Sequence, residues 1–89
     1  MTDTTVTAEL GTPNSNYCIA YVTGAIAAQN DTLIVSNFRK ILGVSGSIEP
    51  SSGNSVPADP DIDDTTKNKI ICTGSDVGTA HLMIVGIPA

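Results

Sequence analysis

Large aromatic residues are almost absent from this sequence, which has no Trp, one Phe and two Tyr among 89 residues. A hydrophobic core without large rings must be assembled from Ile, Val, Leu and Ala, and this composition favours thin β-sheets. The chain is long enough for one domain and too short for two. A domain of this size buries only a modest part of its surface, so partners or further copies often stabilise it.

Charge is also scarce, and positive charge most of all. Charged residues make up 15% of the chain, against about 25% in an average globular domain. Four Lys and Arg residues face nine Asp and Glu residues, for a formal net charge of −5. This balance argues against a nucleic-acid partner, because nucleic acids are bound by clustered Lys and Arg. It equally argues against an anionic membrane surface, and no apolar run approaches the ~20 residues of a membrane span.

The amino terminus lacks the basic region and the apolar run of a signal peptide. We therefore expect the protein to be made in a cytoplasm-like compartment, where disulfides are rare. The two cysteines, Cys18 and Cys72, lie far apart in apolar, β-like runs, and this predicts two buried thiols. A disulfide would require their strands to be neighbours.

Candidate catalytic residues are few. His81 is the one histidine, and because it falls inside an apolar run we interpret it as an ordinary histidine of a sheet. No nucleophile-elbow motif accompanies the serines. One histidine is also too few ligands for a zinc site with the two distant cysteines. We therefore expect no enzymatic activity and no cofactor.

The longest apolar-rich stretch is 32–50, in the middle of the chain. Its first part, 33–35, is a short run rich in β-branched residues. Residues 42–48 then alternate in the manner of a half-buried strand. The positions on one face are Leu42, Val44, Gly46 and Ile48. Residues 36–41 break the alternation and predict a single helical turn or a bulged corner.

Two further regions have strand patterns. Residues 17–28 alternate, and one face carries Cys18, Ala20 and Val22. Residues 68–73 and 79–87 flank a turn with two glycines, which predicts a β-hairpin. Because residues 82–85 are all apolar, the last strand is expected to be central or covered on both sides. Together these patterns predict an all-β domain, a small antiparallel β-barrel or β-sandwich of about five to seven strands.

Two polar segments complete the chain. Residues 1–16 are Thr-rich and are expected to form an extended N-terminal arm, which leaves 17–89 as a single β domain. Residues 50–67 hold three prolines and four aspartates. Because proline cannot donate to a sheet ladder, this segment is expected to be a long acidic loop without a strand.

The acidic cluster in that loop matches part of a calcium-binding motif. Asp59, Asp61 and Asp63 have the spacing of its first three ligands. The match then fails, because Asp64 stands where the motif needs Gly and Ile70 where it needs Glu. We therefore expect an exposed, mobile, solvated loop without a bound metal.

The order of these segments resembles a known family. A polar arm precedes a strand that ends in Gly24, and a basic pair leads into Ile41-Leu-Gly-Val; a variable polar loop and an apolar strand with Gly86 follow. This order resembles that of the small β-rich decoration, or cement, proteins encoded beside the major capsid gene of tailed bacteriophages. The resemblance covers most of 17–88. It implies a structural virion protein without catalytic residues, located on the capsid surface, which binds the assembled shell as a trimer.

The same hypothesis assigns contact residues. Those of the arm that are expected to bind the major capsid protein are Thr2, Thr4, Val6, Ala8 and Leu10. Arg39 and Lys40 are expected to form salt bridges with an acidic loop or a neighbouring subunit. The partners are then the major capsid protein and further copies of the chain. The alternative function is a small soluble β module that binds a carbohydrate or other small ligand through the acidic loop.

Overall fold

The fold is that of a computed structural model, which describes residues 2–14 and 17–89. Within these ranges the strands are β1 (Asp3–Val6), β2 (Glu9–Asn14), β3 (Tyr17–Ile26), β4 (Thr32–Val35), β5 (Phe38–Glu49), β6 (Val56–Pro57), β7 (Pro60–Ile62), β8 (Lys69–Cys72) and β9 (Gly78–Pro88). Among the residues described, no helix has the length and apolar character needed to cross a membrane.

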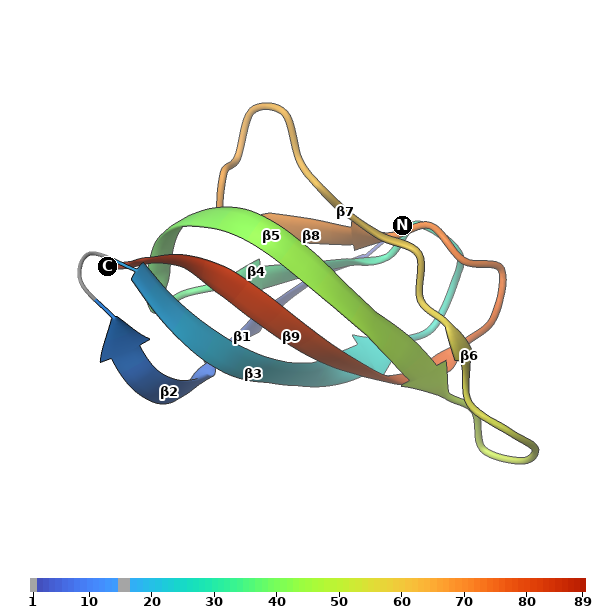
Figure 1. The fold of residues 1–89 in the computed structure, drawn as a ribbon. Coiled ribbons are helices and arrows are strands. Elements are labelled where there is room, and N and C mark those ends of the chain that lie inside the picture. Colours follow the sequence, from blue (N-terminus) through green and yellow to red (C-terminus); the bar gives the residue numbers. More distant parts are fainter. Residues whose placement is uncertain (1, 15–16) are drawn as a thin grey trace.

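The strands form two sheets that pack face to face (Figure 1). Sheet A has the order β1-β4-β8-β7, and sheet B has the order β2-β3-β9-β5-β6. The pairing of β1 with β4 is parallel. The other strand pairings in both sheets are antiparallel. The shortest extent of the molecule is 17 Å, which suits two sheet layers spaced ~10 Å apart. The prediction of a small all-β sandwich is confirmed.

The core lies between the two sheets and is almost entirely aliphatic. Sheet B contributes from β3 and β9 the buried residues Cys18, Ala20, Val22, Ile26, Ala80, Leu82 and Ile84. Sheet A faces them with Leu33, Val35, Ile70 and Cys72, and the start of β5 adds Phe38. The alternation that the sequence predicts for β3 is confirmed, because every second side chain of a strand points to the same face.

The predicted hairpin of the last two strands is wrong. β8 lies in sheet A, where it pairs with β4 and β7, whereas β9 lies in sheet B between β3 and β5. The connection between them, residues 73–77, therefore crosses from one sheet to the other. Both strands still point apolar residues into the same core. The sequence pattern is therefore the same whether two strands pair in one sheet or face each other from two sheets.

The broken alternation at the start of β5 reflects bulges, one of the two alternatives that the sequence left open. The register of β5 against β9 shifts between Phe38 and Lys40 and again between Ile41 and Gly43. An extra residue in one strand reverses the faces that follow it. As a result Leu42 is 44% exposed, although the sequence places it on the buried face with Val44 and Ile48.

The amino-terminal segment, expected as an arm, lies along the domain as two edge strands. β1 pairs with β4 in sheet A, and β2 pairs with β3 in sheet B. Between them, the side chain of Asn37 holds the main chain of Ala8. Its Oδ1 accepts a hydrogen bond from the Ala8 N–H at 2.9 Å, and its Nδ2 donates to the Ala8 carbonyl at 2.9 Å.

The acidic segment 50–67 is not a loop throughout, as predicted, because it contains β6 and β7. β6 pairs with β5 at the edge of sheet B, and β7 pairs with β8 at the edge of sheet A. The prolines occupy positions that suit them: Pro57 ends an edge strand and Pro60 begins one. Figure 1 shows the two remaining loops, 51–55 and 63–68, projecting from the sandwich.

Candidate functional site

One half of the outer face of sheet B is apolar and exposed. Tyr17 and Ile19 on β3 and Met83 and Val85 on β9 stand on this face, and the bulge in β5 adds Leu42. Their exposed fractions are 47%, 54%, 51%, 36% and 44% in that order. We call these five residues the sheet-B patch. Large apolar side chains that gather on one exposed face are typical of an interaction surface.

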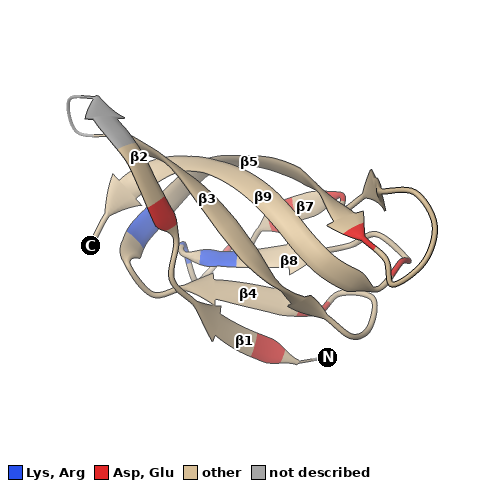
Figure 2. Ribbon diagram, turned by 90° about the horizontal axis from the view of Figure 1, so that it is seen from below, with Lys and Arg blue, Asp and Glu red and all other residues tan. Residues whose placement is uncertain are grey.

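The patch is continuous across the strands. Ile19 stands directly opposite Val85, and the next pair on the same face of these two strands is Tyr21 with Met83. Shallow hollows open beside Ile19, one of them lined by Tyr17, Leu42 and Val85. Neither β3 nor β9 contains Lys, Arg, Asp or Glu, and Figure 2 shows both ribbons without a charged segment. The patch is therefore a shallow, uncharged surface.

The other half of the same face is polar and is organised around His81. The Tyr21 hydroxyl lies 2.5 Å from His81 Nδ1, and His81 Nε2 lies 2.8 Å from Glu49 Oε1. The two rings are nearly parallel, with an interplanar angle of 19°. Because an ionised carboxylate only accepts hydrogen bonds, His81 Nε2 donates to Glu49, and Nδ1 forms the hydrogen bond with the Tyr21 hydroxyl. Both ring nitrogens are thus used in a cross-strand network, as suits a histidine that orders a sheet.

The outer face of sheet A has a different character. Thr32 donates a hydrogen bond to the carboxylate of Asp3, and Lys69 Nζ lies 3.6 Å from the same carboxylate. The Thr32 hydrogen bond and the Lys69 charge hold the pKa of Asp3 below its usual value, although partial burial opposes them. This face carries ionic groups on β1 and β8, which suits contact with water. The two faces of the sandwich are therefore not equivalent.

The structure places the five predicted arm residues in different environments. Thr2 is exposed, Thr4 and Val6 are half-buried, and Ala8 is buried with only 5% exposed. Val6 packs against the core. Leu10 is 52% exposed; it stands opposite Ala20, on the inner side of sheet B. The side chains of Val6 and Ala8 thus pack within the domain itself, while those of Thr2 and Leu10 remain accessible.

Arg39 and Lys40, predicted to contact a neighbouring subunit, are both exposed at the start of β5. Figure 2 shows this basic segment near the carboxyl terminus, away from the acidic end of β5. Their predicted role in contacts between subunits stays a prediction.

The acidic segment is ordered by its own hydrogen bonds. Asp63 Oδ2 accepts from the N–H groups of Thr65 and Thr66 at 3.0 and 2.7 Å, and these bonds lower the pKa of Asp63. Asp59 adopts a φ of 47°, and its carbonyl accepts from the Thr73 hydroxyl at 2.7 Å. Among the described residues, no group of three or more metal-binding side chains is close enough to hold an ion.

The cysteines are buried free thiols, as predicted. Cys18 lies in sheet B and Cys72 in sheet A, on strands that are not paired with each other. Burial, together with the nearby carboxylate of Asp31, raises the pKa of the Cys72 thiol. Their sulfur atoms therefore act as core hydrophobes.

Sequence reasoning missed the sheet-B patch. The signal was present, because Ile19, Met83 and Val85 alternate with buried residues of the same strands. The all-apolar run near Met83 favoured a strand covered on both sides. β9 is central in its sheet as predicted, but among the described residues only one of its faces is covered.

Comparisons of this chain with protein-family models, with curated proteins and with solved structures found no match.

Proposed function

We propose that this protein is a structural virion protein, a capsid decoration or cement protein that binds the assembled shell of a major capsid protein and stabilises it. The single observation that carries the proposal is the exposed sheet-B patch on an otherwise well-packed small sandwich. An apolar face of this kind favours a protein that works while packed against other proteins. The order of arm, strands and polar loop, which resembles such cement proteins, supports the same function.

The mechanism is mass action. A protein that binds the assembled shell, and not its separate subunits, stabilises the shell by the free energy of binding. No turnover is required, and the proposal assigns no catalytic residue. The protein would be made in the host cytoplasm and located on the capsid surface, as a trimer or a similar cluster of copies.

The amino-terminal segment can contact a shell without leaving the domain. β1 and β2 are edge strands of the two sheets, so each has an outer row of main-chain groups available to pair with another chain. Pairing of an added strand with such an edge gives affinity through main-chain hydrogen bonds. Of the predicted contact residues, Thr2 and Leu10 are then the ones with exposed side chains, and Thr4 is half-buried. Val6 and Ala8 would contribute by holding the edge in place.

The proposal is tested by sedimentation of the purified protein with shells assembled from the major capsid protein encoded with it. We expect saturable co-sedimentation and a higher temperature of shell disruption. Unassembled capsid protein is the matched control and should not bind. Absence of co-sedimentation at saturating concentration would remove capsid decoration as the function.

The alternative, a module that binds a small ligand through the acidic segment, has less support. The Asp63 carboxylate already accepts two backbone hydrogen bonds. Asp61 Oδ1 likewise accepts from the N–H of Ile62 at 2.9 Å. Carboxylate oxygens that are used in turns have fewer free acceptor positions for a ligand. A ligand-dependent rise in melting temperature with a panel of sugars would revive this alternative.

A further inference from the structure

The chain crosses from sheet B to sheet A between β6 and β7, and Asp59 stands at this crossing. Its φ of 47° is in the left-handed region, although the residue that follows it is Pro60. A proline normally keeps the residue before it extended, with a negative φ. A residue other than glycine in this conformation is strained, and strain of this kind is concentrated at functional positions.

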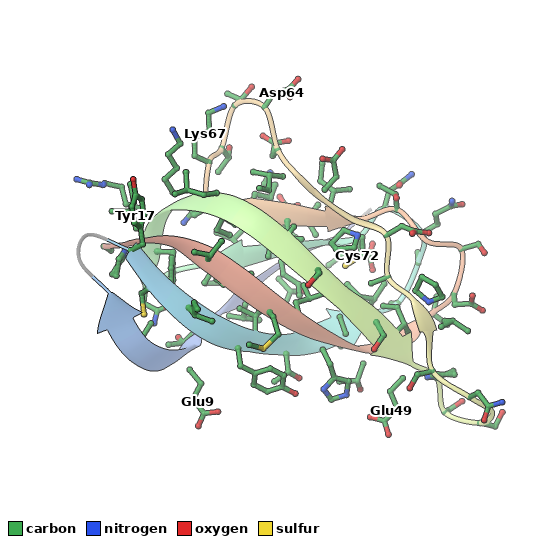
Figure 3. All side chains as sticks on the ribbon, viewed as in Figure 1. Glu9, Tyr17, Glu49, Asp64, Lys67 and Cys72 are labelled. Carbon is green, nitrogen blue, oxygen red and sulfur yellow. The ribbon has the colours of Figure 1, made fainter. Side chains whose placement is uncertain are left out.

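The carbonyl of Asp59 accepts two hydrogen bonds from one residue. The Thr73 N–H donates to it at 3.1 Å and the Thr73 hydroxyl at 2.7 Å. The N–H of Gly74 donates to the preceding carbonyl, that of Ala58, at 3.1 Å. Figure 3 shows Cys72, the residue before Thr73, at the end of β8 where β7 pairs with it. Two donors fixed on one carbonyl oxygen would stabilise the negative charge that develops there when the carbonyl carbon is attacked.

The side chain of Asp59 can supply the nucleophile. Asp59 is exposed, and among the described residues no hydrogen bond or ion pair engages its carboxylate. The carboxylates of Asp61 and Asp63, by contrast, accept hydrogen bonds in their own turns. An aspartate carboxylate reaches its own main-chain carbonyl carbon through a five-membered ring, which needs only rotation of the side chain. The group that leaves is then the basic nitrogen of Pro60.

We propose that the chain cleaves its own Asp59–Pro60 peptide bond. A carboxylate oxygen of Asp59 attacks the Asp59 carbonyl carbon, the bond to the Pro60 nitrogen breaks, and that nitrogen takes up a proton from the solvent. The cyclic anhydride that remains is opened by a water molecule, which leaves two carboxyl groups on Asp59. The net reaction is hydrolysis of one peptide bond by one water molecule, and each chain reacts once.

The two pieces would stay together after cleavage. Residues 1–59 keep β1 to β6, and residues 60–89 keep β7 to β9. β8 pairs with β4, and β9 lies between β3 and β5, so each sheet contains strands from both pieces. The inference does not rest on binding to a shell, and it adds a self-processing activity to the proposed function.

The test is mass spectrometry of the full chain after incubation at pH 5, in native buffer and in parallel in denaturing urea. We expect the fragments 1–59 and 60–89 to form on the order of tenfold faster in the folded chain, because unfolding removes the hydrogen bonds from Thr73. The folded chain is stable at this pH, which lies above the range in which the contacts of Asp31 are lost.

The Glu49–Pro50 bond is the internal control in the same samples. A glutamate would need a less favourable six-membered ring, and Glu49 Oε1 already accepts a hydrogen bond from His81 Nε2 at 2.8 Å. This bond should stay intact. Fragments that end at Glu49 in equal amount would indicate general acid hydrolysis or a protease, and would count against the proposed reaction.

Two positions are varied to separate the nucleophile from the hydrogen-bond donors. Asp59→Gly introduces a residue that tolerates a positive φ, so this variant should fold and should not cleave. Thr73→Val removes the hydroxyl and should slow cleavage about tenfold in the folded chain, without an effect in urea. Thr73→Ser keeps a hydroxyl and should cleave at close to the wild-type rate.

Each of four results would overturn the inference: an intact wild-type chain after prolonged incubation, equal rates in the folded and the unfolded chain, cleavage of Asp59→Gly at the wild-type rate, or cleavage of folded Thr73→Val at the wild-type rate. If a variant does not fold, the comparison of the folded with the unfolded wild-type chain still decides the question. Capsid co-sedimentation is measured separately. A chain that cleaves itself but does not bind shells would refute the proposed function and leave this inference standing.

Discussion

The carboxylate of Asp31 ties the amino terminus to the turn that joins β3 and β4. Its Oδ1 accepts a hydrogen bond from the N–H of Thr2 at 2.8 Å, and its Oδ2 accepts from the N–H groups of Ala27 and Ala28, each at 3.0 Å. The hydrogen bond from Thr2, followed by those from Ala27 and Ala28, lowers the pKa of Asp31. A side chain that is only 3% exposed thus holds two segments that are distant in sequence.

This geometry predicts acid sensitivity. Because the folded-state pKa of Asp31 is below the unfolded value near 3.8, the folded state binds fewer protons than the unfolded state at pH values between the two pKa values. The stabilisation is present above about pH 4 and is lost as the pH falls through the folded-state pKa. Asp31→Asn should lower stability at pH 7 and flatten the loss of stability between neutral and acid pH. Urea unfolding at a series of pH values measures both effects.

Asp76→Asn is the control for that experiment. Asp76 is exposed in the connection between β8 and β9, so its replacement should leave the pH dependence close to that of the wild type. A profile of Asp31→Asn parallel to the wild type would show that the Asp31 carboxylate is not the stabilising group.

The contact between Asn37 and Ala8 predicts that the amino-terminal segment stabilises the domain. Asn37→Ala removes two hydrogen bonds to the main chain of the buried Ala8 and should cost about 1–3 kcal/mol of unfolding free energy. Chemical denaturation measures the loss. The control is Asn54→Ala, in the exposed loop after β5, which should cost less than about 0.5 kcal/mol.

Deletion of residues 1–10 is predicted to lower stability more than Asn37→Ala does. The deletion removes β1, the buried Ala8 and the partner of the Asp31 carboxylate. Circular dichroism and thermal unfolding of the truncated chain measure the effect. If the truncated chain kept the wild-type melting temperature, the segment would be the independent arm that the sequence suggested.

Thiol chemistry gives a further prediction. Burial raises the pKa of Cys72, and because the thiolate is the reactive form, this thiol should react slowly with a maleimide in the native protein at pH 7. Both cysteines should react rapidly in denaturant, which serves as the control. The mass of the untreated, non-reduced protein should correspond to two free thiols; a mass lower by two protons would indicate a disulfide and contradict this reading.

Calcium is predicted not to stabilise the protein. The Asp63 carboxylate is engaged with Thr65 and Thr66, and the segment departs from the calcium motif at Asp64 and Ile70. Thermal unfolding with and without calcium at sub-millimolar concentration should give the same melting temperature, with magnesium as the comparison. A calcium-specific rise of several degrees would show that the acidic segment is a metal site.

Local pattern determined much of this protein. The alternation of Cys18, Ala20 and Val22 predicted which face of β3 is buried, because side chains of a strand point to its two faces in turn. The scarcity of large rings predicted a thin aliphatic sandwich. The residues on the other face of the same strand form part of the exposed patch, but a periodic pattern indicates only that a face is apolar. It does not state whether the chain itself covers that face.

Tertiary structure decided the rest. The sequence could not assign β8 and β9 to different sheets, because Ile70 and Leu82 point into one core from opposite sides and this looks the same as a hairpin in a linear pattern. It could not predict that Leu42 is exposed, because one extra residue at a bulge changes which face of the strand the side chains occupy. Nor could it place the amino-terminal segment, since its attachment depends on Asp31 and Asn37, about 29 residues away. These features depend on contacts between distant residues, which composition and periodicity do not record.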